Sequence, residues 1–371
     1  MTGSGLTFEA LGAGYGDTLL VSCAHGRGTW LLLVDTGPDE CWPTLKARLE
    51  RLPADAKGRR HIDLVVISHI DHDHIGAAKA LFDDRTLGLS FGDIWFNAPP
   101  RLATRGVAEG QTLAELLGAQ PAALPWNRAW AGAPAVTLAD RLFVELPSSA
   151  GQPRLTLLSP SATKLDALFK VWDKELRALA KPAKRRAAPA VSRGLLDLQA
   201  LAAKKTPLDR APANGSSIAL LLEHEGVSVL LTADAHATVL VPALRALATH
   251  RGTALPWKVD VFKLSHHGSR ANVTLDLLST VQAQHYVVST NGAIFGHPDD
   301  EAIARTVLHG GTPQTIWFNY ANEHSARWAA TSLQAWGSSA KEPVAGTTGV
   351  TLEIARRATE SQTLTSASIS R

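Results

Sequence analysis

Five side chains that can bind a metal ion lie within six residues of one another. They follow the apolar run 64–67 directly, and they are His69, Asp71, His72, Asp73 and His74. Packing these groups together without a cation would crowd like charges. A divalent metal removes that conflict, because it takes neutral imidazoles and ionised carboxylates together at about 2 Å. The spacing therefore predicts a metal centre within residues 68–76.

The same segment has a simpler interpretation as an acidic, histidine-containing loop. Such a loop would only cap the helix that follows it, with Asp73 near the helix N-terminus. Clusters of this density rarely arise by chance, so the metal interpretation is preferred.

Strands and helices must alternate around this cluster. Short β-branched and aromatic runs predict strands, and leucines at helical spacing predict helices. In the first half we expect strands over 18–22, 30–34, 64–67 and 94–96, and helices over 42–51 and 75–82. In the second half we expect strands over 155–158, 217–222, 227–231, 259–264 and 286–289, and helices over 237–248, 275–281 and 298–309. This order is typical of an α/β fold built from layers.

Residues 161–205 differ from their surroundings and predict a basic helical insertion. They contain eleven Lys or Arg against four Asp or Glu, and their middle, 181–189, has the composition of a flexible basic loop. Three interpretations stay open, namely a solvated helical pair, a clamp over nucleic acid and a docking surface for a partner protein. Phosphate binding needs clustered cations, which makes Lys184, Arg185 and Arg186 candidate substrate-binding residues.

The overall composition is that of a globular protein. The chain has 371 residues, of which 45% are hydrophobic and 19% charged, and its formal charge of +3 permits an anionic partner without requiring one. Two cysteines are too few for a disulfide framework, and no apolar run approaches the length of a membrane span. We expect a cytoplasmic protein with no membrane partner, whose Ser- and Thr-rich residues 358–371 form a disordered tail.

The metal-capable cluster resembles the His-x-His-x-Asp-His signature of the metallo-β-lactamase superfamily, in its His-x-Asp-x-Asp-His variant. His72 falls on a variable position of that signature, and His69, Asp71, Asp73 and His74 fall on the pattern. Further landmarks of the family follow in order, at 14–17, 33–37, 231–234, 265–269 and 296–298. As a set they are most similar to the nuclease-like domain of the competence DNA-uptake channel protein, over residues 7–354 without the insertion.

This resemblance implies a fold and a ligand set. The fold is an α/β sandwich of four layers over residues 1–357, in which two mixed sheets lie between helical layers. His69 and Asp71 would bind one metal, and Asp234 would lie between the two metals. Asp73, His74 and His266 would bind the other. Asp35 would accept a hydrogen bond from a ligating histidine rather than bind metal itself.

Carboxylates in place of imidazoles change the expected metal. Enzymes with an all-histidine first site have another histidine where this chain has Asn214, which we interpret as a weak ligand or a phosphate-binding group. Oxygen donors are harder ligands than imidazoles, which shifts the preference of such a site from Zn²⁺ toward Mn²⁺ or Mg²⁺. Zn²⁺ is still a candidate.

Two divalent ions about 3.5–4 Å apart can bridge and deprotonate a water molecule and stabilise charge on attacking and leaving oxygens. We expect Asp73 to orient that nucleophile or accept its proton, and His267 or His297 to donate a proton to the leaving group. Strand alternation puts Lys263 on the same face as Ser265, where it contacts a phosphate or lies on the surface.

Three functions compete at this point. The first is a phosphodiesterase or nuclease that acts on DNA or RNA, indicated by the carboxylate-rich ligand set and the basic insertion. The second is a hydrolase of a carbon ester, thioester or lactone, although such enzymes usually carry a histidine at the position of Asp71. The third is a metal-bearing scaffold within a defence or toxin assembly.

Overall fold

The computed structural model describes residues 4–26, 28–99, 109–119, 124–179 and 196–355, which form two mixed β-sheets. In the first sheet β14, β1, β2 and β3 pair antiparallel, whereas β3, β4 and β5 run parallel. Its strands in spatial order are β14 (Val350–Ala355), β1 (Ser4–Ala10), β2 (Leu19–His25), β3 (Gly28–Val34), β4 (Arg60–Val66) and β5 (Leu89–Trp95).

The second sheet is also mixed. Strands β9 to β13 run parallel, and β6 to β9 pair antiparallel. Its strands in spatial order are β13 (Ser338–Lys341), β12 (Gln314–Phe318), β11 (Val281–Val288), β10 (Trp257–Lys263), β9 (Val227–Leu231), β8 (Ala219–His224), β7 (Arg154–Ser159) and β6 (Val144–Glu145).

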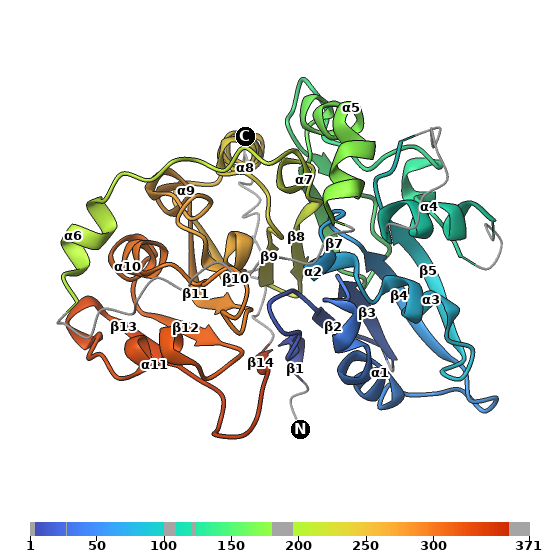
Figure 1. Cartoon of the computed structure of the whole chain (residues 1–371), viewed down its shortest axis with the longest axis horizontal. Coiled ribbons are helices and arrows are strands. Elements are labelled where there is room, and N and C mark those ends of the chain that lie inside the picture. Colours follow the sequence, from blue (N-terminus) through green and yellow to red (C-terminus); the bar gives the residue numbers. More distant parts are fainter. Residues whose placement is uncertain (1–3, 27, 100–108, 120–123, 180–195, 356–371) are drawn as a thin grey trace, which may run out of the picture.

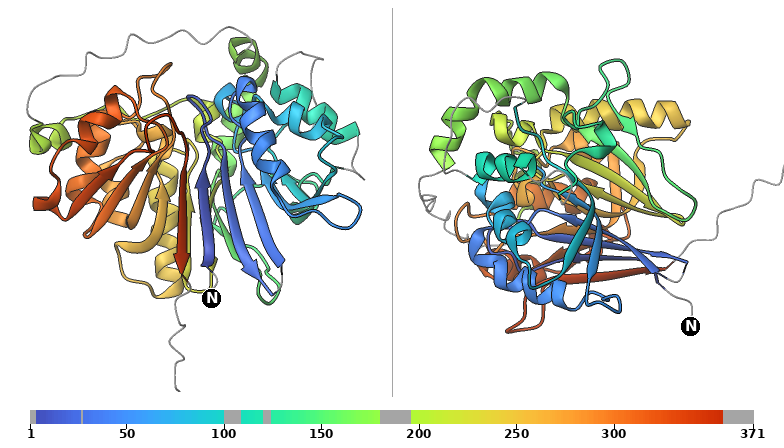
Figure 2. Two further views of the ribbon diagram at one scale, coloured as in Figure 1. Left: turned by 90° about the horizontal axis from the view of Figure 1, so that it is seen from below. Right: turned by 90° about the vertical axis from the view of Figure 1, so that its right-hand side faces the viewer.

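Helices cover the outer face of each sheet (Figures 1 and 2). The first sheet is covered by α1 (Trp42–Glu50), α3 (Ala78–Asp83), α4 (Glu109–Ala119) and α5 (Ala162–Leu179). The second sheet is covered by α6 (Leu198–Ala203), α8 (Ala237–Arg251), α9 (Leu275–Thr280), α10 (Asp300–His309) and α11 (Glu323–Ala329). The four-layer sandwich with two mixed sheets is therefore confirmed.

Three hydrophobic layers hold the four structural layers together. Successive residues of a strand point to opposite faces, so Leu32 and Val34 of β3 pack between the sheets while Leu31 and Leu33 pack against helices. Strands that are buried on both faces need continuous apolar runs. Such runs are easy to recognise in the sequence, as in β3.

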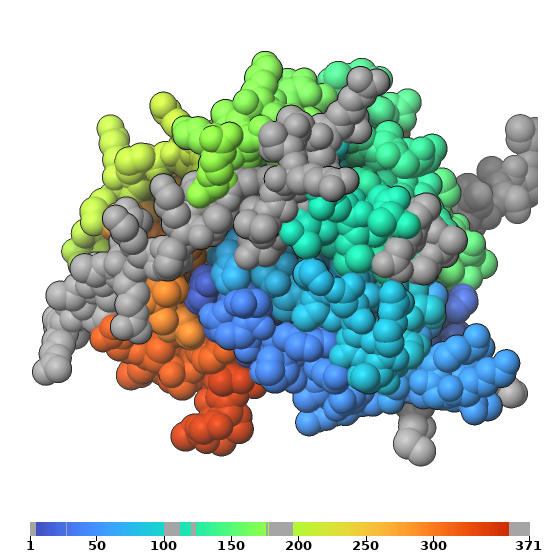
Figure 3. Space-filling view, turned by 45° about the vertical axis from the view of Figure 1, so that its right-hand side comes forward, coloured from blue at the N-terminus to red at the C-terminus, as the bar shows by residue number. Residues whose placement is uncertain are grey.

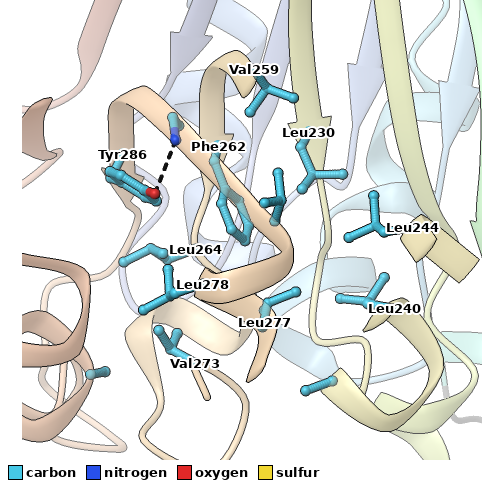
Figure 4. Packing of buried hydrophobic residues seen from close by; sticks show 14 of the residues in the cluster. Leu230, Leu240, Leu244, Val259, Phe262, Leu264, Val273, Leu277, Leu278 and Tyr286 are labelled. Atoms are coloured by element: carbon cyan, nitrogen blue, oxygen red, sulfur yellow. Dashed lines mark hydrogen bonds between the residues drawn. The ribbon is translucent and has the colours of Figure 1, made fainter. Parts of the chain in front are cut away.

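The core of the second half is built around Phe262 of β10 and Tyr286 of β11. Figure 4 shows Phe262 among leucines of α8 and α9, with the Tyr286 hydroxyl next to a backbone nitrogen. That nitrogen belongs to Ala283 and lies 3.0 Å from the hydroxyl oxygen, so the buried phenol is hydrogen-bonded. A hydrogen-bonded hydroxyl lets a large aromatic ring fill the core without an unpaired polar atom.

Several elements differ from the sequence-based expectation. The helix expected over 75–82 is two helices, α2 (His72–Ile75) and α3. Gly76, between them, packs against the backbone of Asp39, where a Cβ would lie 2.6 Å from the Asp39 nitrogen. Strands β1 and β14 were not predicted, and they pair with each other across the whole chain.

The insertion reaches both halves of the molecule. Leu168 and Trp172 of α5 pack in the first-half core, whereas Leu198 and Ala202 of α6 pack in the second-half core. Figure 3 shows α5, in green, above the first-half elements in blue and cyan. The expected tail 358–371 and the expected basic loop 181–189 lie outside the described residues. No helix among the described residues has the length and apolar character that crossing a membrane requires.

Candidate metal centre

The metal-capable residues meet where parallel strands of both sheets end. The segment with His69 and His74 follows β4, Asp234 follows β9, and His266 and His267 follow β10. The carboxyl ends of parallel strands are the usual place for ligand sites in α/β folds. Residues nearly two hundred positions apart in the chain are thereby brought into one cluster.

One half of this cluster is buried and consists of Asp73, His74, His267 and one oxygen of Asp234. The His267 Nε2 atom lies 3.2 Å from Asp73 Oδ2 and 3.8 Å from Asp234 Oδ1. The His74 Nε2 atom lies 3.4 Å from Asp234 Oδ1 and 3.8 Å from Asp73 Oδ2. We call these four residues the inner group.

The other half contains His69, Asp71, His266 and the second oxygen of Asp234, and we call it the outer group. The His69 Nε2 atom lies 3.6 Å from Asp71 Oδ2 and 3.9 Å from Asp234 Oδ2. The His266 Nε2 atom lies 3.5 Å from Asp234 Oδ2. Asp234 thus presents one carboxylate oxygen to each group.

Unpaired atoms in the cluster test whether metal ions fit it. The Nε2 atoms of His69, His74 and His267 and the Oδ1 atom of Asp234 are buried and have no hydrogen-bond partner among the described residues. Buried polar atoms without partners are costly, and imidazole nitrogens with carboxylate oxygens are suitable metal donors. The donor set of this buried cluster therefore fits divalent metal binding.

The helix-capping interpretation of the cluster finds no support in the geometry. Asp71, and not Asp73, is the residue at the N-cap of α2, and its side chain makes no capping hydrogen bond. Asp73 lies within the helix and faces His267.

The grouping of the late histidines differs from the sequence-based one. We expected His266 beside Asp73 and His74, but His267 lies there, and His266 lies with His69 and Asp71. Both consecutive histidines have left-handed backbone angles, with φ of 48° and 53°, which sends their side chains into different groups. His267 is fully buried in the inner group, so the structure does not place it where a proton donor would meet a leaving group.

His297 lies beside the outer group. Its ring centroid is 5.3 Å from that of His266, and its Nδ1 atom is 3.4 Å from Asp299 Oδ2. Burial lowers the pKa of His297 below its ordinary value, against the effect of Asp299. Its imidazole is therefore neutral near pH 7.

Asp35 orients two of the histidines, which confirms its predicted supporting role. Its Oδ2 atom lies 2.8 Å from His74 Nδ1 and accepts a hydrogen bond of 2.7 Å from the Ser68 hydroxyl. The Ser68 oxygen in turn lies 3.0 Å from His69 Nδ1. A ring whose Nδ1–H is held in this way presents the free Nε2 to a metal.

Asp17 was not predicted as a site residue, and it lies on the far side of the inner histidines. Its Oδ1 atom is 3.4 Å from His267 Nδ1, which also lies 2.7 Å from the Ser289 carbonyl oxygen. Asp17 forms a buried ion pair with Lys263. The only signal in the sequence was its place in the landmark 14–17.

Lys263 is buried and does not lie on the surface. Its side chain is 0% exposed beneath the inner group, paired with Asp17. Strand alternation could not show that this end of β10 is covered on both faces, and the surface expectation for Lys263 is therefore wrong.

A second residue missed from the sequence, Asp209, lies behind the outer group. Its Oδ2 atom is 3.4 Å from His266 Nδ1 and accepts a hydrogen bond of 2.8 Å from Asn214 Nδ2. Asn214 is buried next to His266, with its Nδ2 atom 3.3 Å from His266 Nδ1. Asp209 lies in an irregular segment without any motif, so no local pattern identifies it.

Electrostatics inside the cluster favour charged histidines. Burial lowers the pKa of His267, but the carboxylates of Asp17 and Asp234 outweigh burial and raise this pKa to about 9. The pKa of His74 is raised well above its ordinary value, since Asp234 and Asp73 outweigh its burial. Burial would raise the pKa of Asp234, but the surrounding imidazoles hold it well below its ordinary range. Without a metal, protonated imidazoles balance the buried carboxylates.

The predicted phosphate-binding cations of the insertion cannot be placed. Lys184, Arg185 and Arg186 lie outside the described residues.

Comparison with known proteins finds a family match for the N-terminal part of the chain, which contributes the first residues of this site. Residues 11–87, which contain the segment from His69 to His74, match the family model described as the metallo-beta-lactamase superfamily. No curated protein matches the sequence. Among solved structures, the metallo-beta-lactamase fold protein YhfI from Bacillus subtilis is 12% identical, with a TM-score of 0.41, over 94% of this chain and 98% of that one. Igni18, a metallo hydrolase from the archaeon Ignicoccus hospitalis, is 13% identical, with a TM-score of 0.38, over 94% of this chain and 99% of that one.

Proposed function

We propose that this chain, whose residues 11–87 match the metallo-beta-lactamase superfamily model, is a two-metal phosphodiesterase that cleaves DNA or RNA. The observation that carries this proposal is Asp234, whose two oxygens face two separate donor groups. Each group adds two imidazoles and one further carboxylate, Asp73 in the inner group and Asp71 in the outer group.

The two groups would hold one divalent cation each. Bound cations would supply Lewis-acid stabilisation of charge on a phosphodiester and lower the pKa of water. A donor set with three carboxylates is suited to Mn²⁺ or Mg²⁺ as well as Zn²⁺. The resemblance of the motif set to a nuclease-like domain supports a phosphodiester substrate over a carbon ester.

The side chains around the cations would orient the reacting groups and move protons. Asp73 would hold the attacking water by a hydrogen bond from its inner-group position. His297 is neutral near pH 7 and has Asp299 beside Nδ1. We assign His297 to receive a proton at Nε2 and return it to the leaving oxygen. Asn214 is the candidate contact to a non-bridging phosphate oxygen.

The nucleic-acid partner is proposed from the basic insertion. Lys184, Arg185 and Arg186 would contact backbone phosphates, which carry no sequence information. Replacing all three by alanine is expected to weaken binding of every oligonucleotide alike and to flatten its salt dependence.

A substrate panel tests the proposed function. The purified full chain, loaded with Mn²⁺, Mg²⁺ or Zn²⁺, is incubated with single-stranded DNA, double-stranded DNA, RNA, a cyclic dinucleotide, and a thioester and lactone. We expect cleavage of at least one phosphodiester and loss of that activity in Asp73→Ala.

The matched control is His72→Ala, next to Asp73 in the same helix. The His72 ring points away from the cluster, with its Nε2 atom 3.3 Å from Asp39 Oδ1, so this variant should keep full activity. Turnover of only the thioester or lactone would replace the proposal with carbon-ester hydrolysis. A metal-loaded protein that leaves every substrate intact would indicate a scaffold.

A further inference from the structure

We propose that Asp209 is a positioning residue for the outer group, and that through it the segment 204–211 fastens the basic insertion to the metal centre. This inference rests on the proposed function only in requiring that the outer group binds a metal. The segment follows α6 and leads to α7 (Pro212–Gly215), crossing from the second half of the molecule toward the first (Figure 1).

Asp209 fixes the amide of Asn272, and Asn272 fixes the ring of His266. The Asn272 Nδ2 atom donates hydrogen bonds of 3.1 Å to Asp209 Oδ2 and to the Asp234 carbonyl oxygen. With its nitrogen held there, Asn272 turns its Oδ1 atom toward His266 Nδ1 at 3.1 Å. The His266 Nδ1–H therefore has acceptors in Asn272 and Asp209, which leaves Nε2, facing Asp234, as the nitrogen that can bind a metal.

The same carboxylate fixes the amide of Asn214. Because Asn214 Nδ2 donates to Asp209 Oδ2 at 2.8 Å, the amide cannot flip without losing that bond. The Asn214 Oδ1 atom is then a buried acceptor with no hydrogen-bond partner among the described residues. The Asp209 carboxylate thus fixes the amide orientation of both asparagines. It turns the Oδ1 atom of Asn272 toward His266 and leaves the Oδ1 atom of Asn214 as an acceptor.

Asp209 also contacts the start of the insertion through His236. Its Oδ1 atom lies 3.6 Å from His236 Nε2, and His236 Nδ1 lies 3.2 Å from the ammonium nitrogen of Lys164 on α5. Gly215 leaves room for this arrangement, since a Cβ there would lie 2.8 Å from the His236 ring. Lys164 at the start and Asp209 after the end of the insertion therefore meet at one histidine, two residues after Asp234.

Backbone contacts hold the segment in this position. The Thr206 hydroxyl donates a hydrogen bond of 2.9 Å to the Arg270 carbonyl oxygen. Arg305 donates one of 2.7 Å to the Lys204 carbonyl oxygen. Both contacts join the segment to residues that follow His266 and His267 in the chain. They fix the backbone ahead of Asp209 and so help to hold Asp209 next to His266.

Metal titration of the full chain tests the assignment. Metal-free wild type, Asp209→Asn and Asp209→Ala are titrated with Mn²⁺ in a calorimeter and with Co²⁺ by visible absorption, which reports the coordination of each ion. We expect one of the two ions to bind about 10- to 100-fold more weakly in Asp209→Asn, with a changed Co²⁺ spectrum for that ion only. Asp209→Glu should recover part of the affinity.

The control is Asp197→Asn, in the same insertion. Asp197 caps α6 through the Ala200 nitrogen and lies away from the metal groups, so this variant should bind both ions like wild type. Unfolding of the metal-free forms checks that Asp209→Asn destabilises the fold no more than Asp197→Asn does.

The outcomes separate this inference from the proposed function. Wild-type affinity and an unchanged Co²⁺ spectrum in Asp209→Asn would overturn the positioning role, whatever the substrate panel shows. Weakened binding of one ion in a protein that cleaves no phosphodiester would support the positioning role and reject the nuclease proposal. A wild-type protein that binds no metal would overturn both.

Discussion

The Nδ1 atom of His74 lies 2.8 Å from Oδ2 of Asp35, although the two residues come from different strand ends. The same carboxylate reaches His69 through the Ser68 hydroxyl. One buried aspartate therefore orients a histidine of the inner group and a histidine of the outer group.

Replacing Asp35 by asparagine should weaken both metals. The amide keeps the shape of the side chain but no longer offers carboxylate oxygens to His74 and Ser68. We expect about a 10- to 100-fold loss of affinity for each ion, measured by competition with a chromophoric chelator. Asp55→Asn, in an exposed turn, is the control and should bind metal like wild type. Loss of affinity for only one ion would mean that the link through Ser68 is not used.

Metal binding at pH 7 should release protons. The pKa of His267 is raised to about 9 and that of His74 well above its ordinary value, so both rings are protonated in the metal-free protein. A metal ligand must be neutral at the binding nitrogen. We therefore expect release of about two protons on loading the inner group, and affinity that rises with pH from 6 to 9. Calorimetry in buffers of different ionisation enthalpy measures the number; a value near zero would contradict the raised pKa values.

Replacing Lys263 by methionine should strongly destabilise the fold. Lys263 and Asp17 are both fully buried and paired, and removing one partner leaves an uncompensated charge. We expect a loss of about 3–5 kcal/mol in the free energy of unfolding, measured with urea. The double variant Asp17→Asn with Lys263→Met should regain much of this loss. If the single and double variants are equally unstable, packing and not charge is responsible.

Ala233 carries strain in the turn that presents Asp234. Its φ is 44°, and a left-handed alanine costs roughly 1–2 kcal/mol. Glycine at this position removes the strain. It also loses the buried methyl group and makes the unfolded chain more flexible, and these two effects together lower the stability by about 1–2 kcal/mol. Ala233→Gly should thus be nearly neutral in urea unfolding. Ala235→Gly, which is also buried but is not among the residues with positive φ, should lose about 1–2 kcal/mol. Equal losses in the two variants would show that the turn is unstrained.

Much of the layered fold followed from local patterns. Helix α1 begins at Trp42 as predicted, and the strands expected over 217–222 and 227–231 are β8 and β9, which pair antiparallel. Strands β1 and β14 were not predicted, and the pairing of Phe8 with Leu352, which joins the two ends of the described chain, has no local signature.

The sequence by itself determined the chemistry of this protein. The donors from His69 to His74 are contiguous, so their types and spacing identify a metal centre before any folding is considered. Only the tertiary structure decided how those donors are shared and supported. Which of His266 and His267 joins Asp73 depends on two left-handed residues, and the buried partner of Asp17 lies 246 positions away in the chain. Such contacts arise when two sheets pack face to face, and no periodicity or motif within a short stretch of sequence encodes them.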